Sequence, residues 1–199
     1  MRTLKLLAIC AVSAFTLFAG GCASMQPASP AAPTAYRESI ALAGRLSVRY
    51  QAQGREEALH GSFSWQQDAR RTEVSLSSPL GQTIARISVE PGLASLTQAG
   101  QATRTATDVD SLAESALGWP LPVSGLRDWL QGQAVASGGR SFSASPGKDT
   151  VITDDGWKLH YVAWQDSAPG MPRRIDLERD TRHAGLVAIR IVIDEWSAR

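Results

Sequence analysis

The residue best placed for chemistry in this chain is Cys22, a thiol that directly follows three small residues. Two basic side chains within the first five residues precede an apolar run of 13 residues, Leu6–Phe18, and Ala19-Gly20-Gly21 then lie before the cysteine. A basic start, an apolar middle and a small-residue end are typical of an export signal. The run is shorter than the roughly 20 residues of a permanent membrane span. We therefore expect residues 1–21 to be a cleaved signal.

The placement of Cys22 resembles that of bacterial lipoprotein signals, in which the thiol is diacylated and the amine freed by cleavage is acylated. An ordinary secretory signal is the alternative, because it also ends in small residues. Cys10 leaves with the signal, so the mature chain keeps one cysteine and cannot form an internal disulfide. A free thiol is a liability in an oxidising compartment, which favours acylation. Ala23 follows, and in the sorting pattern that this segment resembles a residue other than Asp indicates the outer membrane.

Residues 22–34 are predicted to be a flexible tether behind the acylated cysteine. They are rich in Ala, Ser and Pro and carry no charge, so they cannot bury enough apolar surface to fold, and they reach up to about 40 Å when extended. Residues 35–199 have the size of a single domain. The whole chain has 20 Lys and Arg and 19 Asp and Glu. This balance attracts neither nucleic acid nor an anionic membrane through bulk charge, and we expect no nucleic-acid partner.

No arrangement of side chains typical of catalysis or of metal binding occurs in the rest of the sequence. His60, His160 and His183 are scattered and no two have metal-ligand spacing. The chain has no nucleophile elbow and no phosphate-binding glycine loop, and Gly138-Gly139 is interpreted as a flexible connection. Asp154-Asp155-Gly156 is interpreted as a hairpin turn rather than a calcium loop. We therefore expect no metal, no cofactor and no enzymatic activity.

Alternation of apolar and polar residues dominates the domain and predicts β-strands. Gly44, Leu46, Val48 and Tyr50 take one face of the first strand, with polar residues between them. The other predicted strands are Leu59–Gln66, Glu73–Leu76, Thr83–Val89, Ala94–Gln98, Thr103–Ala106, Arg140–Ala144, Val151–Thr153, Trp157–Trp164, Arg173–Arg179 and Leu186–Glu195. Gly and Pro separate most of these runs, which is typical of antiparallel hairpins.

Two short helices are predicted in the middle of the chain. Apolar residues recur at helical spacing over Val109–Leu117, with Thr107 as the predicted N-cap and Gly118 as the stop. A rigid apolar connector, residues 118–122, leads to a second helix that ends near Gly132. A long antiparallel sheet curls, and a helical pair inserted midway can cover its open side. The predicted fold is therefore mainly β, an incomplete, half-open antiparallel barrel of about eleven strands with a short-helix lid over a hydrophobic cavity.

An ordered set of short segments resembles the LolB family of outer-membrane lipoprotein receptors. The likeness covers the whole mature domain, and the fold that it implies agrees with the one predicted from periodicity. The segments that carry it are Gly44-Arg45-Leu46-Ser47-Val48, Phe63-Ser64-Trp65-Gln66-Gln67, Leu76-Ser77-Ser78-Pro79-Leu80-Gly81, Gly118-Trp119-Pro120-Leu121-Pro122, Leu126-Arg127-Asp128-Trp129-Leu130-Gln131-Gly132 and Ile191-Val192-Ile193-Asp194-Glu195-Trp196.

The resemblance implies a function in lipoprotein sorting. The protein would accept triacylated lipoproteins from the periplasmic carrier LolA and insert their acyl chains into the inner leaflet of the outer membrane, as a lipid-anchored monomer facing the periplasm. The loop Pro79-Leu80-Gly81 matches the family's membrane-inserting loop, with Leu80 at the position of its exposed leucine. From the residues alone, Leu80 could equally be a turn leucine that folds back onto the core.

Ten apolar residues are candidates for the wall of an acyl-chain cavity. Alternation does not distinguish a ligand-holding interior from a filled core, so both interpretations stay open for each residue. A lipocalin-like outer-membrane lipoprotein that binds another hydrophobic ligand, and a structural envelope protein with a filled barrel, are the alternative functions. The candidate cavity residues are Leu46, Val48, Phe63, Trp65, Leu76, Ile87, Leu112, Leu117, Leu126 and Trp129.

Overall fold

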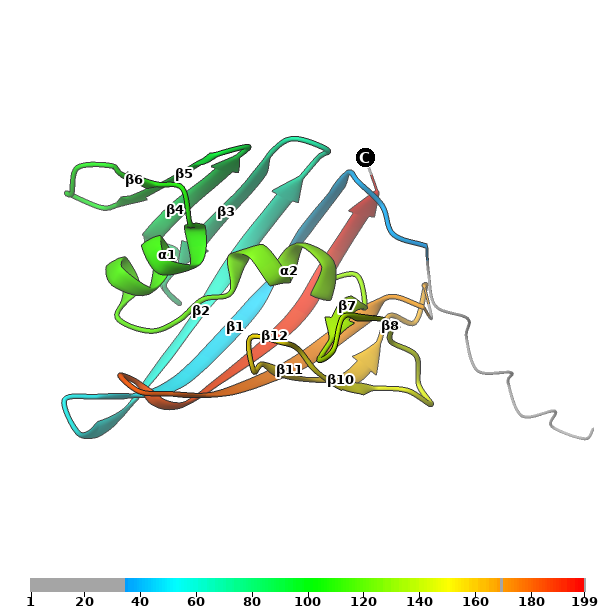
Figure 1. Ribbon diagram of the computed structural model, residues 1–199. Coiled ribbons are helices and arrows are strands. Elements are labelled where there is room, and N and C mark those ends of the chain that lie inside the picture. The colour runs from blue at the N-terminus through cyan, green and yellow to red at the C-terminus, as the bar shows by residue number, and fades with distance from the viewer. Residues whose placement is uncertain (1–34, 169, 199) are drawn as a thin grey trace, which may run out of the picture.

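The structure of the protein, a computed structural model, describes residues 35–168 and 170–198. The predicted signal and tether, with Cys22, lie outside the described residues. Ten strands form one antiparallel sheet in the order β6-β5-β4-β3-β2-β1-β12-β11-β10-β9 (Figure 1). These strands are β1 (Ile40–Ala52), β2 (Arg55–Gln67), β3 (Thr72–Ser77), β4 (Thr83–Glu90), β5 (Leu93–Gln98), β6 (Arg104–Ala106), β9 (Thr150–Ile152), β10 (Lys158–Trp164), β11 (Pro172–Thr181) and β12 (Gly185–Ala198).

The sheet is not closed into a barrel, which confirms the predicted half-open architecture. Its two edge strands in the described part of the chain, β6 and β9, do not pair with each other. The predicted strand at Arg140–Ala144 is β8 (Arg140–Ser143), but it belongs to a separate two-stranded sheet with β7 (Gln133–Ala136), which was not predicted. Gly138 and Gly139 form the turn of this hairpin at φ of 82° and 77°, conformations that glycine adopts without strain. They are a defined turn rather than a flexible connection.

The central strand β1 is longer than predicted because its alternation begins earlier in the chain. Ile40 and Leu42 are buried on the same face as Leu46 and Val48. A β-bulge relative to β12 lies between Ala43 and Gly44. A Cβ atom at Gly44 would lie 2.1 Å from the carbonyl oxygen of Val192, so this bulge requires glycine.

Two helices cover the face of the sheet on which the buried side chains gather, which we call the inner face (Figure 1). They are α1 (Val109–Leu117) and α2 (Val123–Trp129). The predicted N-cap Thr107 is wrong by one residue, because the carboxylate of Asp108 accepts from the backbone N–H of Asp110 at 3.0 Å. Gly118 ends α1 as predicted, at φ 80° with its N–H bonded to the carbonyl of Glu114. The short α2 ends at Trp129, with Leu130 as its C-cap, before the predicted Gly132.

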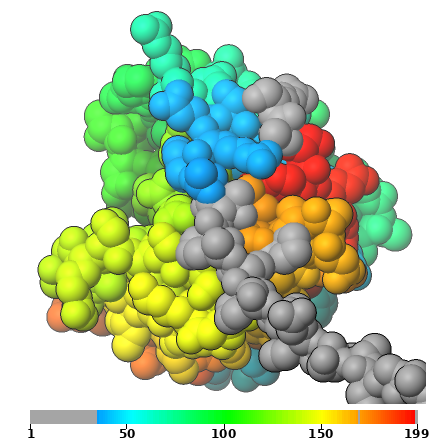
Figure 2. All heavy atoms as spheres, turned by 90° about the vertical axis from the view of Figure 1, so that its right-hand side faces the viewer, coloured from blue at the N-terminus to red at the C-terminus, as the bar shows by residue number. Residues whose placement is uncertain are grey.

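The two ends of the domain lie together. Ile40 at the start of β1 pairs with Ala198 at the end of β12, and Figure 2 shows the first described residues beside the C-terminal strand. The residues that precede β1 also reach the segment just after α2, since the backbone N–H of Arg37 donates to Oε1 of Gln131 at 2.8 Å. The segment through which the predicted tether enters the domain is therefore hydrogen-bonded to the residues that follow α2.

An ion-pair network on the opposite, outer face predicts how stability depends on pH. Burial raises the pKa of the Asp176 carboxyl, but bonds from Arg174 at 2.6 Å and 2.9 Å and from Arg190 at 3.3 Å outweigh burial and hold it below its ordinary value. A carboxyl with a depressed native pKa stabilises the fold above its unfolded pKa of about 4, and this contribution is lost as pH falls through the native pKa. Asp176→Asn is expected to lower the free energy of unfolding at pH 7 by about 1 kcal/mol.

Urea denaturation of both proteins across pH 2–7 measures this difference. The gap between the two proteins should close toward the acid end, because there the native Asp176 is also neutral. A gap that stays constant with pH would show that the asparagine acts through packing rather than through charge.

Candidate functional site

The inner face is apolar and is closed over by the helices. Nine of the ten predicted cavity residues are buried, with exposed fractions of 8% or less, and Leu117 is partly buried. Five of them line one apolar cavity between the sheet and α2, and Val48, Ile87, Leu112, Leu117 and Trp129 do not. The five are Leu46, Phe63, Trp65, Leu76 and Leu126.

Sequence reasoning missed half of the cavity lining. Ile189 and Ile191 lie on the inward phase of β12, and the alternation in that strand was a signal that could have identified them. Leu121 lies in the connector between two prolines, where no periodicity shows which way a side chain points. Leu130 follows α2 directly and is 1% exposed. Leu121 and Leu130 thus form a lid-side wall, whereas Ile189 and Ile191 belong to the sheet-side wall that the strands provide.

The cavity is small in this conformation. Its volume is about 20 Å³, which is no more than the space of about one water molecule. The side chains of α2 and of the connector, including Trp119 and Leu121 at 2% and 4% exposure, fill the rest of the interior. Room for an apolar ligand therefore requires the helical cover to move away from the sheet.

Polar contacts hold the C-terminal end of α2 in place. Arg127 donates to the hydroxyl of Thr72 at 2.8 Å and also to the backbone carbonyl of Asp68, at the turn between β2 and β3. Gln131 is 1% exposed and pairs with the backbone of Arg37 through two bonds of 2.8 Å and 3.0 Å. Because buried polar groups are costly without partners, each of these bonds favours the closed cover.

A further carboxylate joins the two helices. Asp110 of α1 accepts from the backbone N–H of Ser124 at 3.0 Å and from its hydroxyl. Burial raises the pKa of the Asp110 carboxyl, and the bonds from Ser124 act in the opposite direction. The two helices are thus linked to each other as well as to the sheet, so α1, the connector and α2 form one cover.

Removal of the Arg127 contacts should loosen this cover. Arg127→Met keeps an unbranched apolar stem but leaves the buried Thr72 hydroxyl without its donor, so we expect a loss of about 1–2 kcal/mol in the free energy of unfolding. Amide hydrogen exchange in α2 should become faster, since local opening becomes easier. Arg49→Met, on the exposed outer face of β1, is the control. Unchanged exchange in α2 would show that Arg127 does not restrain the cover.

The turn that joins β3 and β4 carries the most exposed large apolar side chain among the described residues. Leu80 is 87% exposed, so it does not fold back onto the core. The N–H of Gly81 donates to the carbonyl of Ser78 at 2.9 Å, and that of Ser78 to the carbonyl of Gln82 at 2.8 Å. With Pro79 fixing its backbone and Gly81 at φ 79°, this turn is well defined and points Leu80 into solvent.

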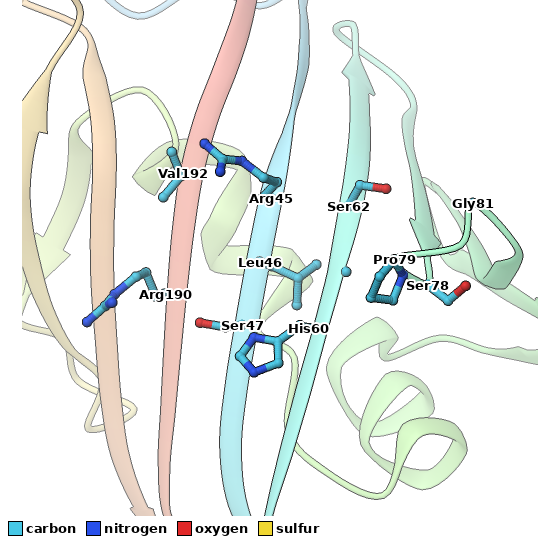
Figure 3. A pocket seen from close by; sticks show the side chains of 11 residues that line it. Arg45, Leu46, Ser47, His60, Ser62, Ser78, Pro79, Gly81, Arg190 and Val192 are labelled. Atoms are coloured by element: carbon cyan, nitrogen blue, oxygen red, sulfur yellow. The ribbon is translucent and has the colours of Figure 1, made fainter.

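The outer face is hollowed next to this turn. A hollow of about 550 Å³ lies between Pro79 and the strands β2, β1 and β12 (Figure 3). In Figure 3 the side chains of Arg45, His60 and Arg190 project on the near side of these strands, and the helices lie behind them. The hollow and the helical cover are thus on opposite faces of the same sheet.

The structure brings no catalytic or metal-binding constellation together in the part that it describes. The three histidines stay apart, and the nearest acidic partner of His160 is Asp149, 3.9 Å from its Nε2 atom. No group of three His, Cys, Asp or Glu residues in residues 35–168 and 170–198 could hold a metal ion. Among the described helices, none has the length and apolarity needed to cross a membrane.

The fold and the site define an open antiparallel half-barrel with a helix-covered apolar interior and an exposed apolar turn at its edge. Sequence comparison places the chain within one family of this class. Residues 38–196 match the family model described as outer membrane lipoprotein LolB. The chain therefore belongs to the LolB family of outer-membrane lipoproteins.

Several relatives carry the same description along most of their length. The outer-membrane lipoprotein LolB of Cupriavidus necator is 41% identical over 174 residues, 87% of this chain and 88% of the relative. That of Thiobacillus denitrificans is 39% identical over 203 residues, 98% and 99% of the two chains. Among solved structures, a LolA-superfamily protein from Nitrosomonas europaea aligns with a TM-score of 0.42 at 9% identity, over 82% of this chain and 87% of that one.

Proposed function

We propose that this protein accepts lipoproteins from the periplasmic carrier LolA and inserts their acyl chains into the inner leaflet of the outer membrane. The observation that carries this proposal is the pairing of a covered apolar interior with Leu80, 87% exposed on the turn between β3 and β4. The interior suits an acyl chain, and the turn suits contact with a bilayer. Membership of the LolB family supports both assignments.

The physical need for such an acceptor follows from the cargo. Three acyl chains of roughly 15 methylenes each, at about 0.8 kcal/mol per methylene, represent on the order of 36 kcal/mol of unfavourable exposure to water. Cargo chains therefore pass directly from one apolar interior to another. Transfer of this kind makes and breaks no covalent bond, so the proposed function needs no catalytic residue, metal or cofactor.

Acyl binding is proposed to begin with displacement of the helical cover. A cavity of about 20 Å³ has no room for even a short run of methylenes, whereas the apolar residues that face α2 would line a much larger space if the helix moved away. The closed state buries Leu126 and Trp129 against the sheet when no cargo is present. Cargo chains would replace these contacts, which keeps the difference in free energy between the empty and loaded states small.

The proposal includes an anchor that keeps the acceptor at the site of delivery. Residues 1–21 act as a lipoprotein signal, Cys22 is acylated, and residues 22–34 tether the single domain of residues 35–199 on the periplasmic side. The protein acts as a monomer. The intact mass of the mature amino terminus tests this part, because an unmodified Cys22 would overturn the lipid anchor without affecting the proposed activity of the domain.

A transfer assay with the mature protein in phospholipid vesicles tests the function. Carrier loaded with a triacylated lipoprotein is added, and cargo is measured on the carrier and on the vesicles over time. We expect cargo to leave the carrier and to reach the vesicles only when this protein is present. Cargo that stays on the carrier would overturn the proposal, and binding of another hydrophobic ligand in its place would support a lipocalin-like role.

A further inference from the structure

Strands β2 and β3 stop pairing beside the turn that carries Leu80, so the sheet divides there. β2 pairs with β3 only between Ser62 and Gln67, whereas it continues along β1 as far as Arg55. The Ser78–Gln82 turn therefore stands where a longer β3 would otherwise continue along β2. At the point of division, a Cβ atom on Gly61 would lie 2.3 Å from the carbonyl oxygen of Ser77, so glycine allows the two strands to approach closely just before they separate.

Cavities on the two faces of the sheet meet at this division. Leu46 lines the apolar cavity under α2, the hollow of about 550 Å³ on the outer face, and a third cavity of about 80 Å³ on the inner face near Leu117 and Trp119. Gly61 lines both the outer hollow and this third cavity. Leu46 and Gly61 are thus walls that the inner cavities and the outer hollow have in common.

We propose that the division is a lateral passage, through which an acyl chain of the cargo leaves the interior between β2 and the Ser78–Gln82 turn. The chain then crosses the outer hollow and enters the bilayer beside Leu80. This inference rests on the proposed function and specifies the route by which delivery occurs. The route is short, because Ser78, Pro79 and Gly81, which flank Leu80, themselves line the outer hollow (Figure 3).

The lining of the outer hollow suits an acyl chain at a phospholipid surface. Leu46, Pro79 and Val192 provide apolar walls. The side chains of Arg45 and Arg190 are 68% and 55% exposed at its edge, where each is ion-paired, with Asp194 at 2.8 Å and with Asp176 at 3.3 Å; none of the described residues that line the hollow itself is acidic. Each guanidinium keeps N–H groups outside its ion pair, and guanidinium N–H groups bind phosphate well, so this edge complements the headgroups of the receiving leaflet while the apolar walls shield the chain.

A removable plug in the hollow tests the passage. His60 is exposed on the outer face of β2 and lines the hollow. The two native cysteines, Cys10 and Cys22, lie in the proposed signal and at the proposed acylation site, so His60→Cys would introduce the one free thiol of the mature protein. Glutathione attached to it through a disulfide fills the hollow with a polar group, and a reductant removes it. Ser64→Cys, on the same strand and face but outside the hollow, is the matched control.

The assay uses the mature lipid-anchored protein in vesicles, with cargo that carries a fluorescent acyl chain. Energy transfer to a lipid-borne acceptor reports arrival in the bilayer, and loss of cargo from the carrier reports acceptance. The adduct at position 60 is expected to slow arrival at least tenfold relative to the reduced form of the same variant, without slowing acceptance. Unchanged arrival, or equal slowing by the adduct at position 64, would overturn the passage. Failure of the wild-type protein to accept cargo would instead overturn the proposed function.

Discussion

Leu80→Glu is expected to abolish delivery of lipoproteins into bilayers while leaving the fold and the acceptance of cargo intact. At 87% exposure the leucine makes little contact with the rest of the domain, so its replacement should change the free energy of unfolding by less than about 0.5 kcal/mol. When the turn inserts into a membrane, loss of the leucine removes about 1.5–3 kcal/mol of favourable insertion free energy, and a carboxylate in its place adds a desolvation penalty. Together these effects predict a decrease of about 100-fold or more in the rate of delivery.

The vesicle transfer assay measures this decrease, and Leu93→Glu is its control. Leu93 is also an exposed leucine, at 50%, and it follows the end of β4, whereas Leu80 precedes the start of the same strand. The two sites therefore lie at opposite ends of one strand and receive the same substitution. Normal delivery by Leu80→Glu would overturn the membrane-inserting role of the turn, as would an equal loss in Leu93→Glu.

Trp129→Ala is expected to have the largest effect on stability. The indole is 5% exposed at the end of α2 and lies 6.4 Å from the ring of Trp157, tilted by 60°. Truncation of a large buried aromatic side chain costs about 3–5 kcal/mol, because it removes apolar burial and leaves a cavity that neighbouring groups fill only in part. Chemical denaturation measures the loss, with Val135→Ala at a site that is 52% exposed as the control. A loss below about 1 kcal/mol would show that α2 is not packed as described.

Gly125 provides an independent test of the same packing. The indole of Trp129 lies back over its own helix, so that a Cβ atom at position 125 would lie 2.3 Å from the ring. Gly125→Ala should therefore destabilise the protein by about 1–3 kcal/mol, although alanine is the better helix former by about 1 kcal/mol. In a Trp129→Ala background the clash is absent, and the same substitution should become neutral or stabilising. Additive effects of the two changes would contradict the contact between them.

The prediction of the strands succeeded where alternation was long. β1, β2 and β12 show apolar residues at every second position over most of their length, and this local pattern suffices to orient each side chain in a half-buried strand. β7 was missed because it has four residues and begins only three residues after a helix, so it provides too few alternations to recognise. The N-cap was placed one residue early because Thr107 and Asp108 are both good caps, and the choice between them depends on which turn packs on β5 and β6.

The residues of the candidate site were predictable as apolar and inward-facing, but their arrangement was not. Leu46 and Leu76 follow from strand phase. Leu121 does not, because a connector between two prolines has no period from which its direction can be inferred. The position of Leu80 in a turn followed from Pro79 and Gly81, yet its exposure depended on whether another part of the chain came to lie over it.

The sequence by itself determined the strand-rich composition of the domain, the two short helices between two blocks of strands, and which residues could line an apolar interior. These properties arise from interactions between residues close in the chain, and periodicity reports them. Only the tertiary structure decided that the interior is filled by its own helical cover, that Leu80 stands free, and that the sheet divides at Gly61 beside an outer hollow. Each of these depends on the distance between elements far apart in the sequence, which is set by how their side chains pack together and leaves no periodic trace in the chain.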